Sequence, residues 1–174
     1  MHRYLATLCL TAGLGFATAN SAAADPTSRF LQTAFGTIPQ PQVVWMNNEL
    51  QDLARRILGH PYGALRLRYW RHNTRTAWIL DEIGKEQPIT TGILVNDGAI
   101  EDIRVLVYRE SRGGEVRQHF FTDQFEGARL KKSSALDRPI DGISGATLSV
   151  RALTRLARLA LSLHQHVTQP HGRR

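Results

Sequence analysis

The sequence is poor in cysteine and lysine, and it has no long uninterrupted apolar run. Its single cysteine, Cys9, lies in an apolar N-terminal stretch, so the rest of the chain offers neither a disulfide framework nor a cysteine metal site. Lysine occurs only as Lys85, Lys131 and Lys132, and arginine supplies the other cations of a chain with a formal net charge of +7. No apolar run reaches the roughly 20 residues that a membrane-spanning helix needs.

Residues 1–24 have the pattern of a secretory signal peptide. Arg3 precedes an apolar stretch, and Ala22 and Ala24 form an Ala-x-Ala cleavage site before Asp25. We therefore predict export to the periplasm. Loss of Arg3 with the leader leaves 21 Lys and Arg against 15 Asp and Glu, a net charge of +6. A basic chain can bind nucleic acid, an anionic membrane surface or an acidic partner, and export argues against nucleic acid. Because no run of cations exceeds two residues, diffuse solvated charge is the favoured explanation, with anionic headgroups or a flavin phosphate as specific partners.

The remaining sequence predicts one domain with an N-terminal helical extension at 25–62, a main domain at 63–168 and a polar tail at 169–174. Asn48 is the expected N-cap of a helix from about Glu49 to Leu58, after a short extended piece at 43–45. Alternating apolar and polar residues predict four strands, near 64–70, 76–80, 89–95 and 99–108, with a hairpin at Asp97 and Gly98. A final amphipathic helix follows from about residue 150. We expect an α+β fold, an antiparallel sheet flanked by helices.

The segment from Asp141 to Ser149 has the strongest functional pattern. Gly142 and Gly145 loosen the backbone, and hydroxyls at Ser144, Thr147 and Ser149 crowd the predicted helix start. Backbone amides at such a helix start attract a phosphate. An alternative explanation is that Ser144 or Thr147 simply caps the helix.

The order Asp141-x-x-Ser144-Gly145-Ala146-Thr147 resembles the flavinylation motif of FMN-binding domains. These occur in the C subunit of the sodium-pumping NADH:quinone reductase, the G subunit of the Rnf complex and many small secreted proteins. The resemblance implies FMN joined through its phosphate to Thr147 by a flavin transferase. It also implies that Ser144, Gly145 and Ala146 shape the phosphate cradle, and that the transferase reads Asp141.

A second segment, Glu110 to Glu115, is similar to a Glu- and Gly-rich loop of the same family, which lies near the flavin. The chain keeps Glu110 and Gly113 but has Arg112 where the family has proline. Together with the motif, the resemblance predicts a cofactor site of nine residues: Glu110, Gly113, Asp141, Gly142, Ser144, Gly145, Ala146, Thr147 and Ser149. Arg151 and Lys131 are expected near the flavin, where positive charge favours its anionic reduced state.

From the resemblance we expect an exported electron carrier with covalent FMN, rather than a self-sufficient enzyme. Its expected partners are a periplasmic flavin transferase and a membrane redox protein, with peripheral membrane contact at the outer face of the inner membrane. Two alternatives stay open: FMN bound without a covalent bond, and a flavin-free basic domain that docks on anionic lipid or an acidic partner. The spacing of the histidines predicts no metal site.

Overall fold

A computed structural model describes residues 25–169 of the chain. The predicted signal peptide at 1–24, with Cys9, and residues 170–174 of the predicted tail lie outside the described residues. Among residues 25–169, no helix is both long enough and apolar enough to cross a membrane.

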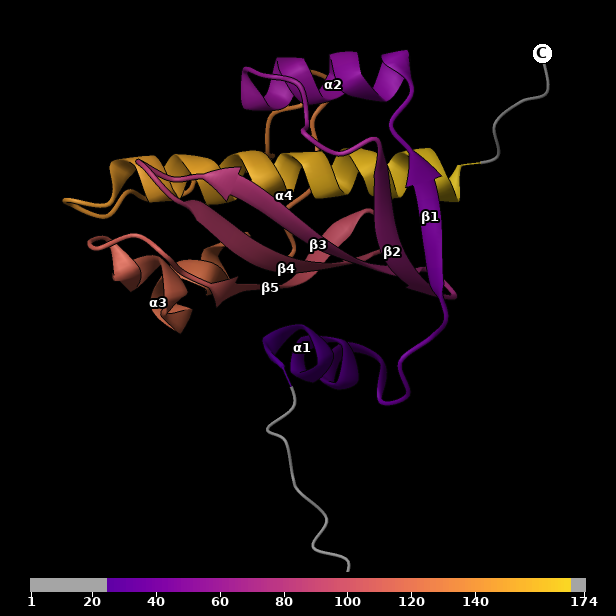
Figure 1. Cartoon of the computed structure of the whole chain (residues 1–174). Helices are drawn as coiled ribbons and strands as arrows, with labels where there is room; N and C mark the ends of the chain where they lie inside the picture. The colour runs from indigo at the N-terminus through magenta and orange to yellow at the C-terminus, as the bar shows by residue number, and fades with distance from the viewer. Residues whose placement is uncertain (1–24, 170–174) are drawn as a thin grey trace, which may run out of the picture.

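The centre of the structure is a five-stranded antiparallel sheet in which each strand pairs with the next along the chain (Figure 1). The strands are β1 (Pro41–Trp45), β2 (Arg66–His72), β3 (Arg75–Ile83), β4 (Pro88–Asn96) and β5 (Ala99–Val107). The predicted hairpin between β4 and β5 is confirmed: Asp97 and Gly98 have φ of 48° and 74°, as a tight two-residue turn requires. The extended piece at 43–45 belongs to β1, which pairs with β2 and so joins 25–62 to the sheet of the main domain.

Helices cover both faces of the sheet. The long helix α4 (Thr147–Thr168) and α2 (Asn48–Leu58) lie on one face, and α1 (Pro26–Phe35) lies on the other (Figure 1). The larger core lies under α4 and contains Tyr69 stacked on Trp78, with ring centroids 4.9 Å apart. A smaller cluster joins Phe30 of α1 to Leu94 of β4. The predicted α+β fold is therefore confirmed.

One predicted helix cap is wrong by one residue. The N-cap of α2 is Asn47, whose side-chain oxygen accepts a hydrogen bond from the Leu50 amide at 2.9 Å. Asn48 is already the first helical residue. The two adjacent asparagines are chemically alike, so composition alone did not distinguish which of them caps the helix. Gly59 ends α2 in the left-handed conformation, with φ of 88°.

The chain between β5 and α4 forms short helical turns. These are a 3₁₀ turn (Gly114–Arg117), α3 (His119–Thr122) and a second 3₁₀ turn (Asp123–Phe125). Phe121 and Phe125 are fully buried and meet edge to face, with centroids 5.6 Å apart. This segment brings the chain back across the end of the sheet to the start of α4.

His164 fastens the C-terminal half of α4 to the sheet. Its Nδ1 lies 2.8 Å from the Thr76 hydroxyl, and its Nε2 accepts a hydrogen bond from the Gly98 amide at 3.1 Å. Because Nε2 accepts, the proton of the neutral ring lies on Nδ1 and is donated to Thr76. Burial of the ring, with the positive charge of Arg71 nearby, lowers the pKa of His164.

Candidate functional site

A cavity of about 650 Å³ opens at the start of α4. Three segments that are distant in sequence form its walls: the turn between β3 and β4, the loop after β5, and the first residues of α4. Its lining residues are Lys85, Glu86, Glu110, Ser111, Arg112, Gly145, Ala146, Thr147, Leu148 and Ser149. Its volume lies within the range typical of small-molecule sites.

The N-terminus of α4 faces this cavity without a side-chain cap. Ala146 is the N-cap residue and makes no capping hydrogen bond, so the idea that Ser144 or Thr147 caps the helix is wrong. A turn precedes it, closed by the bond from the Ala146 amide to the Ile143 carbonyl at 3.0 Å. Gly145 has φ of 81° in that turn, which glycine adopts without strain. The first amides of an uncapped helix have no partner within the helix and attract an anion.

Thr147 is the first residue of α4, and its side chain is exposed. It therefore presents a hydroxyl beside the helix amides, at the wall of the cavity. Ser149 lies two residues further into the helix and is buried, with 5% of its surface exposed. Of the two hydroxyls, only that of Thr147 is accessible for bonding to a ligand.

The loop after β5 packs directly against the helix start. Gly113 has φ of 81°, and a Cβ at this position would lie 3.1 Å from the Ala146 Cβ and 3.0 Å from the Tyr108 hydroxyl. Tyr108 donates a hydrogen bond to the Arg112 carbonyl at 2.5 Å, and the Ser149 hydroxyl lies 3.0 Å from the same phenol oxygen. The phenol has one proton, so Ser149 donates in the second bond. Tyr108 thus ties the loop to α4.

Glu110 organises a different wall. Its Oε1 accepts hydrogen bonds from three consecutive backbone amides of the β3–β4 turn: those of Lys85, Glu86 and Gln87, at 2.5, 2.7 and 2.9 Å. These bonds, that to Gln87 foremost, lower the pKa of the Glu110 carboxyl. A Cβ at Gly84 would lie 2.9 Å from the same oxygen, so the turn closes tightly on the carboxylate. Glu110 therefore fixes the turn that carries Lys85.

The cations of the cavity differ from those expected. Arg151 and Lys131 do not line it, and its positive groups are Lys85 and Arg112. Arg151 is on the exposed side of α4, one turn beyond the N-terminus, and Lys131 is in an exposed loop whose amide bonds to Ala135. Sequence proximity to the motif was thus a poor guide, because the cations come from two other segments.

The structure brings together most, but not all, of the nine predicted site residues. Those that line the cavity are Glu110, Gly145, Ala146, Thr147 and Ser149. Gly113 packs behind Ala146. Asp141, Gly142 and Ser144 are exposed and do not line it. The Asp141 amide instead donates a hydrogen bond to the Gln124 side-chain oxygen at 2.7 Å, which anchors the loop that leads into the motif.

Sequence reasoning missed Tyr108, Lys85 and Leu148. Tyr108 follows the last residue of β5, and a tyrosine at a strand end has no pattern that marks it as a brace. Lys85 belongs to a turn 62 residues before Thr147 in the numbering of the chain, and only the hairpin places it at the cavity. Leu148 lies between two hydroxyl residues of the motif, so its pattern gave no sign of a separate role. In the structure it lines the cavity, and 43% of its surface is exposed.

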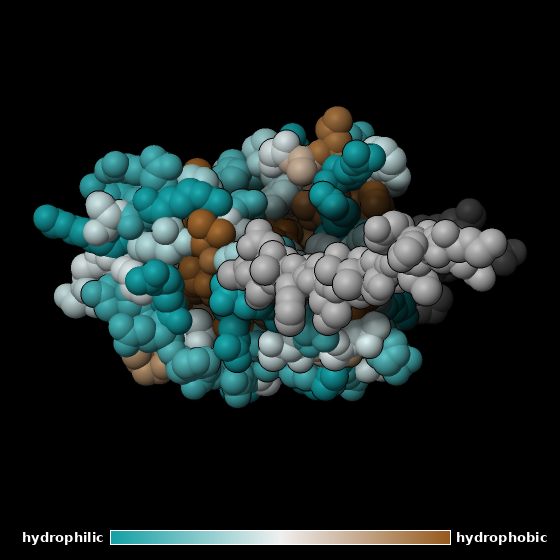
Figure 2. Space-filling model, turned by 60° about the horizontal axis from the view of Figure 1, so that its bottom comes forward, coloured by the Kyte–Doolittle hydropathy of each residue, from teal (hydrophilic) through white to brown (hydrophobic). Residues whose placement is uncertain are grey.

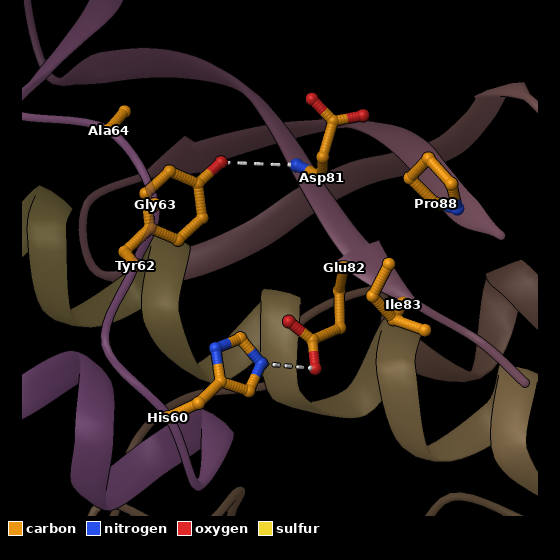
Figure 3. A pocket seen from close by; sticks show the side chains of 8 residues that line it. All are labelled: His60, Tyr62, Gly63, Ala64, Asp81, Glu82, Ile83 and Pro88. Atoms are coloured by element: carbon orange, nitrogen blue, oxygen red, sulfur yellow. Dashed lines mark hydrogen bonds and ion pairs between the residues drawn. The ribbon is translucent and has the colours of Figure 1, made fainter. Parts of the chain in front are cut away.

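A second, smaller cavity of about 280 Å³ lies between the loop that precedes β2 and the adjoining ends of β3 and β4 (Figure 3). Glu82, with 2% of its side chain exposed, faces His60 at 3.1 Å and Arg155 of α4 at 3.6 Å. The hydrogen bond of His60 to the Pro61 carbonyl, with the Glu82 carboxylate, raises the pKa of the His60 imidazole. These contacts fasten the loop before β2 to β3 and α4. None of the nine predicted site residues lines this cavity.

The match to a known protein family covers the larger cavity and excludes most of the smaller one. Residues 84–162 match the model of a family described as FMN-binding domain. This range runs from the β3–β4 turn into α4 and contains every residue that lines the larger cavity, whereas His60 and Tyr62 of the smaller one lie outside it. No curated protein matches the chain. In the part of the chain that the structure describes, no group of three or more His, Cys, Asp or Glu residues is arranged to hold a metal ion.

Proposed function

Because the chain belongs to the FMN-binding domain family, we propose that this flavoprotein holds one FMN in the larger cavity, joined through its phosphate to the Thr147 hydroxyl. The observation that carries this proposal is the position of Thr147. Its exposed hydroxyl stands at an uncapped helix N-terminus, on the wall of the cavity. A phosphate esterified there would accept hydrogen bonds from the first backbone amides of the helix. The positive end of the helix dipole would also stabilise its negative charge.

The surrounding residues suit a phosphate. Gly145 keeps the turn before α4 free of a side chain, and a Cβ there would meet nothing within 4 Å, which leaves room beside the helix start. Lys85 and Arg112 supply positive charge from the two other walls, which also carry Glu110 and Glu86, the ion-pair partner of Lys85. In forming the ester, the Thr147 oxygen would bond to the flavin phosphorus while the phosphoanhydride bond of an activated flavin dinucleotide breaks. A nucleoside monophosphate would leave and the hydroxyl proton would pass to solvent, with a flavin transferase as the catalyst.

We propose electron transfer as the role of the bound cofactor, since the isoalloxazine ring of FMN accepts and donates electrons. The protein holds the ring, excludes part of the solvent and sets the local charge. Lys85 and Arg112 favour the negative charge that reduction brings, whereas Glu110 and Glu86, which pairs with Lys85 at 3.1 Å, oppose it. A carrier role is proposed because the family resemblance implies one.

The pattern of residues 1–24 supports export to the periplasm as part of this proposal. The first helix begins at Pro26 with Asp25 as its N-cap, whose carboxylate accepts from the Thr27 and Ser28 amides. Cleavage after residue 24 would leave this cap intact. A covalent ester would retain the flavin outside the cytoplasm. The expected partners are a periplasmic flavin transferase and a membrane redox protein at the outer face of the inner membrane.

Variants of neighbouring hydroxyl residues test the attachment. Thr147→Ala should abolish covalent FMN when the protein is produced with a flavin transferase, and Thr147→Ser should restore it. Ser144→Ala is the matched control, because Ser144 is exposed in the adjacent turn and does not line the cavity. Intact mass and in-gel flavin fluorescence after denaturation report the adduct. Normal flavinylation of Thr147→Ala would contradict the proposed linkage.

The same samples separate the two alternative functions. FMN that copurifies with the native protein but is released by acid would indicate non-covalent binding. A colourless protein that neither takes up FMN nor becomes modified would contradict flavin binding and leave the basic docking domain.

A further inference from the structure

The edge of the sheet opposite the cofactor cavity exposes a group of large apolar side chains. Trp45 has 64% of its surface exposed, Leu65 has 78% and Val43 has 46%. Trp45 and Val43 belong to β1, and Leu65 directly precedes β2. Clusters of exposed apolar residues on a soluble domain typically mark an interaction surface.

The pairing of β1 with β2 places an arginine directly beside each of the two exposed apolar side chains of β1. Trp45 lies opposite Arg66, and Val43 lies opposite Arg68. Paired residues on neighbouring antiparallel strands point to the same face of the sheet. The alternate residues Val44 and Leu67 are buried on the other face, which confirms the orientation. Leu65 precedes β2 and is out of phase with Arg66 and Arg68, so it is not counted with them. We call Val43, Trp45, Arg66 and Arg68 the β1 patch.

The two arginines of the β1 patch are available to an external anion. Both are exposed, and neither takes part in any ion pair between the residues that the structure describes. The helix on this face, α1, packs mainly over β3, β4 and β5. Its apolar cluster extends to Trp70 in β2, whereas Val43, Trp45, Arg66 and Arg68 stay exposed beyond it. Figure 2, viewed with the side of α1 turned forward, shows hydrophobic side chains set among hydrophilic ones rather than one continuous apolar face.

We propose that the β1 patch is the surface by which the protein docks on an anionic lipid bilayer. Tryptophan and aliphatic side chains partition into the interface between lipid headgroups and acyl chains, and arginines beside them bind anionic headgroups. The proposal rests on the proposed export for its biological setting, but the docking itself needs no bound FMN. It assigns the general basic charge of the chain to one defined face.

The position of the β1 patch favours lipid over a protein partner. β1 and the start of α4 lie at opposite ends of the molecule in Figure 1. An electron-transfer partner must come close to the flavin, so it would be expected at the cavity rather than at β1. A symmetric pair of two such patches would place arginines against arginines, which like-charge repulsion disfavours. Docking through β1 leaves the cavity open to a soluble or membrane partner.

Vesicle flotation of the exported protein, purified from its periplasmic host, tests the proposal. We expect binding to vesicles of phosphatidylglycerol and phosphatidylethanolamine, and little binding to phosphatidylcholine alone. Replacing Arg66 and Arg68 together by Gln should weaken binding about 30-fold, from roughly 1 kcal/mol for each basic residue at the surface. Trp45→Ala should weaken it about tenfold.

Two controls match these changes. Replacing Lys131 and Lys132 by Gln removes the same charge from an exposed loop outside the β1 patch, and Phe120→Ala removes an exposed aromatic residue of α3. Both should bind within about twofold of the unaltered protein. Unchanged urea unfolding midpoints verify that each variant is folded.

The proposal is overturned if the unaltered protein does not bind anionic vesicles, or if the lysine control loses as much affinity as the arginine variant. Binding to an acidic protein without binding to vesicles would also overturn it. Equal binding of flavin-loaded and flavin-free protein to anionic vesicles would support the proposal. The Thr147 variants test the FMN linkage separately.

Discussion

Replacing Gly113 by alanine should damage the cofactor site through one added methyl group. Gly113 has φ of 81°, a conformation that L residues adopt at a cost of about 1 kcal/mol or slightly more. The new Cβ would lie 3.1 Å from the Ala146 Cβ and 3.0 Å from the Tyr108 hydroxyl, both closer than normal contact. Crowding of this kind typically costs a further 1 to 2 kcal/mol, roughly.

Gly59→Ala separates the two contributions. Gly59 has φ of 88°, but a Cβ there would meet nothing within 4 Å. The control should therefore lose only about 1 kcal/mol of unfolding free energy, from backbone strain. Gly113→Ala should lose about 2 to 3 kcal/mol, from strain and crowding together.

Urea unfolding of both variants measures these losses, and FMN content after production with the transferase measures the site. Gly113→Ala should carry less FMN than Gly59→Ala, because the methyl group pushes Ala146 and the start of α4 away from the loop. Equal stability losses, or full FMN content in Gly113→Ala, would refute the inferred packing of the loop on the helix start.

Three further predictions concern single polar side chains. Tyr108→Phe should lower the unfolding free energy by about 1 to 2 kcal/mol in urea denaturation, because two hydrogen bonds of the phenol are lost; no loss would contradict its bracing role. Glu110→Ala should speed hydrogen exchange of the amides at 85–87, whereas Glu110→Gln, which keeps an acceptor oxygen, should do so less; equal exchange in both variants would count against the clamp. The pKa of His164 is lowered by folding, so its contribution to stability is complete above the unfolded value near 6.5 and is lost as pH falls through the folded value. His164→Asn should flatten the pH dependence of urea unfolding below pH 6.5, and an unchanged slope would contradict this; His60, whose pKa is raised, contributes with the opposite sign and must be compared in its own variant.

Local sequence patterns predicted much of the fold. The alternation in β2 reflects one open face of the sheet, whereas β4 is buried along nearly its whole length. Asp97 with Gly98 identified the tight β4–β5 hairpin because few residues accept positive φ there. The role of β1 was less apparent, since a five-residue edge strand has little periodicity of its own. Its membership of the sheet depends on pairing with β2, a contact that no local pattern encodes.

The candidate site was predictable where its residues belong to short family motifs. Gly145 to Thr147 in one segment and Glu110 with Gly113 in another were identified in this way, and the structure brings the two segments together. Lys85 and Arg112 reach the cavity through the β3–β4 hairpin and the loop after β5, so their position is a tertiary property. Asp141 belongs to the motif in sequence but lies away from the cavity lining, where its backbone contacts Gln124. This exposed position is compatible with recognition by a transferase, as the family resemblance implies.

The most direct test of the account is to locate the flavin within the chain by mass. The protein, produced with a flavin transferase and exported, is digested, and the peptide that spans the start of α4 is fragmented. We predict that this peptide carries the mass of one FMN less one water, and that the fragments place it on Thr147. Flavin on Ser144 or Ser149, or an unmodified peptide from protein exposed to an active transferase, would contradict the central claim.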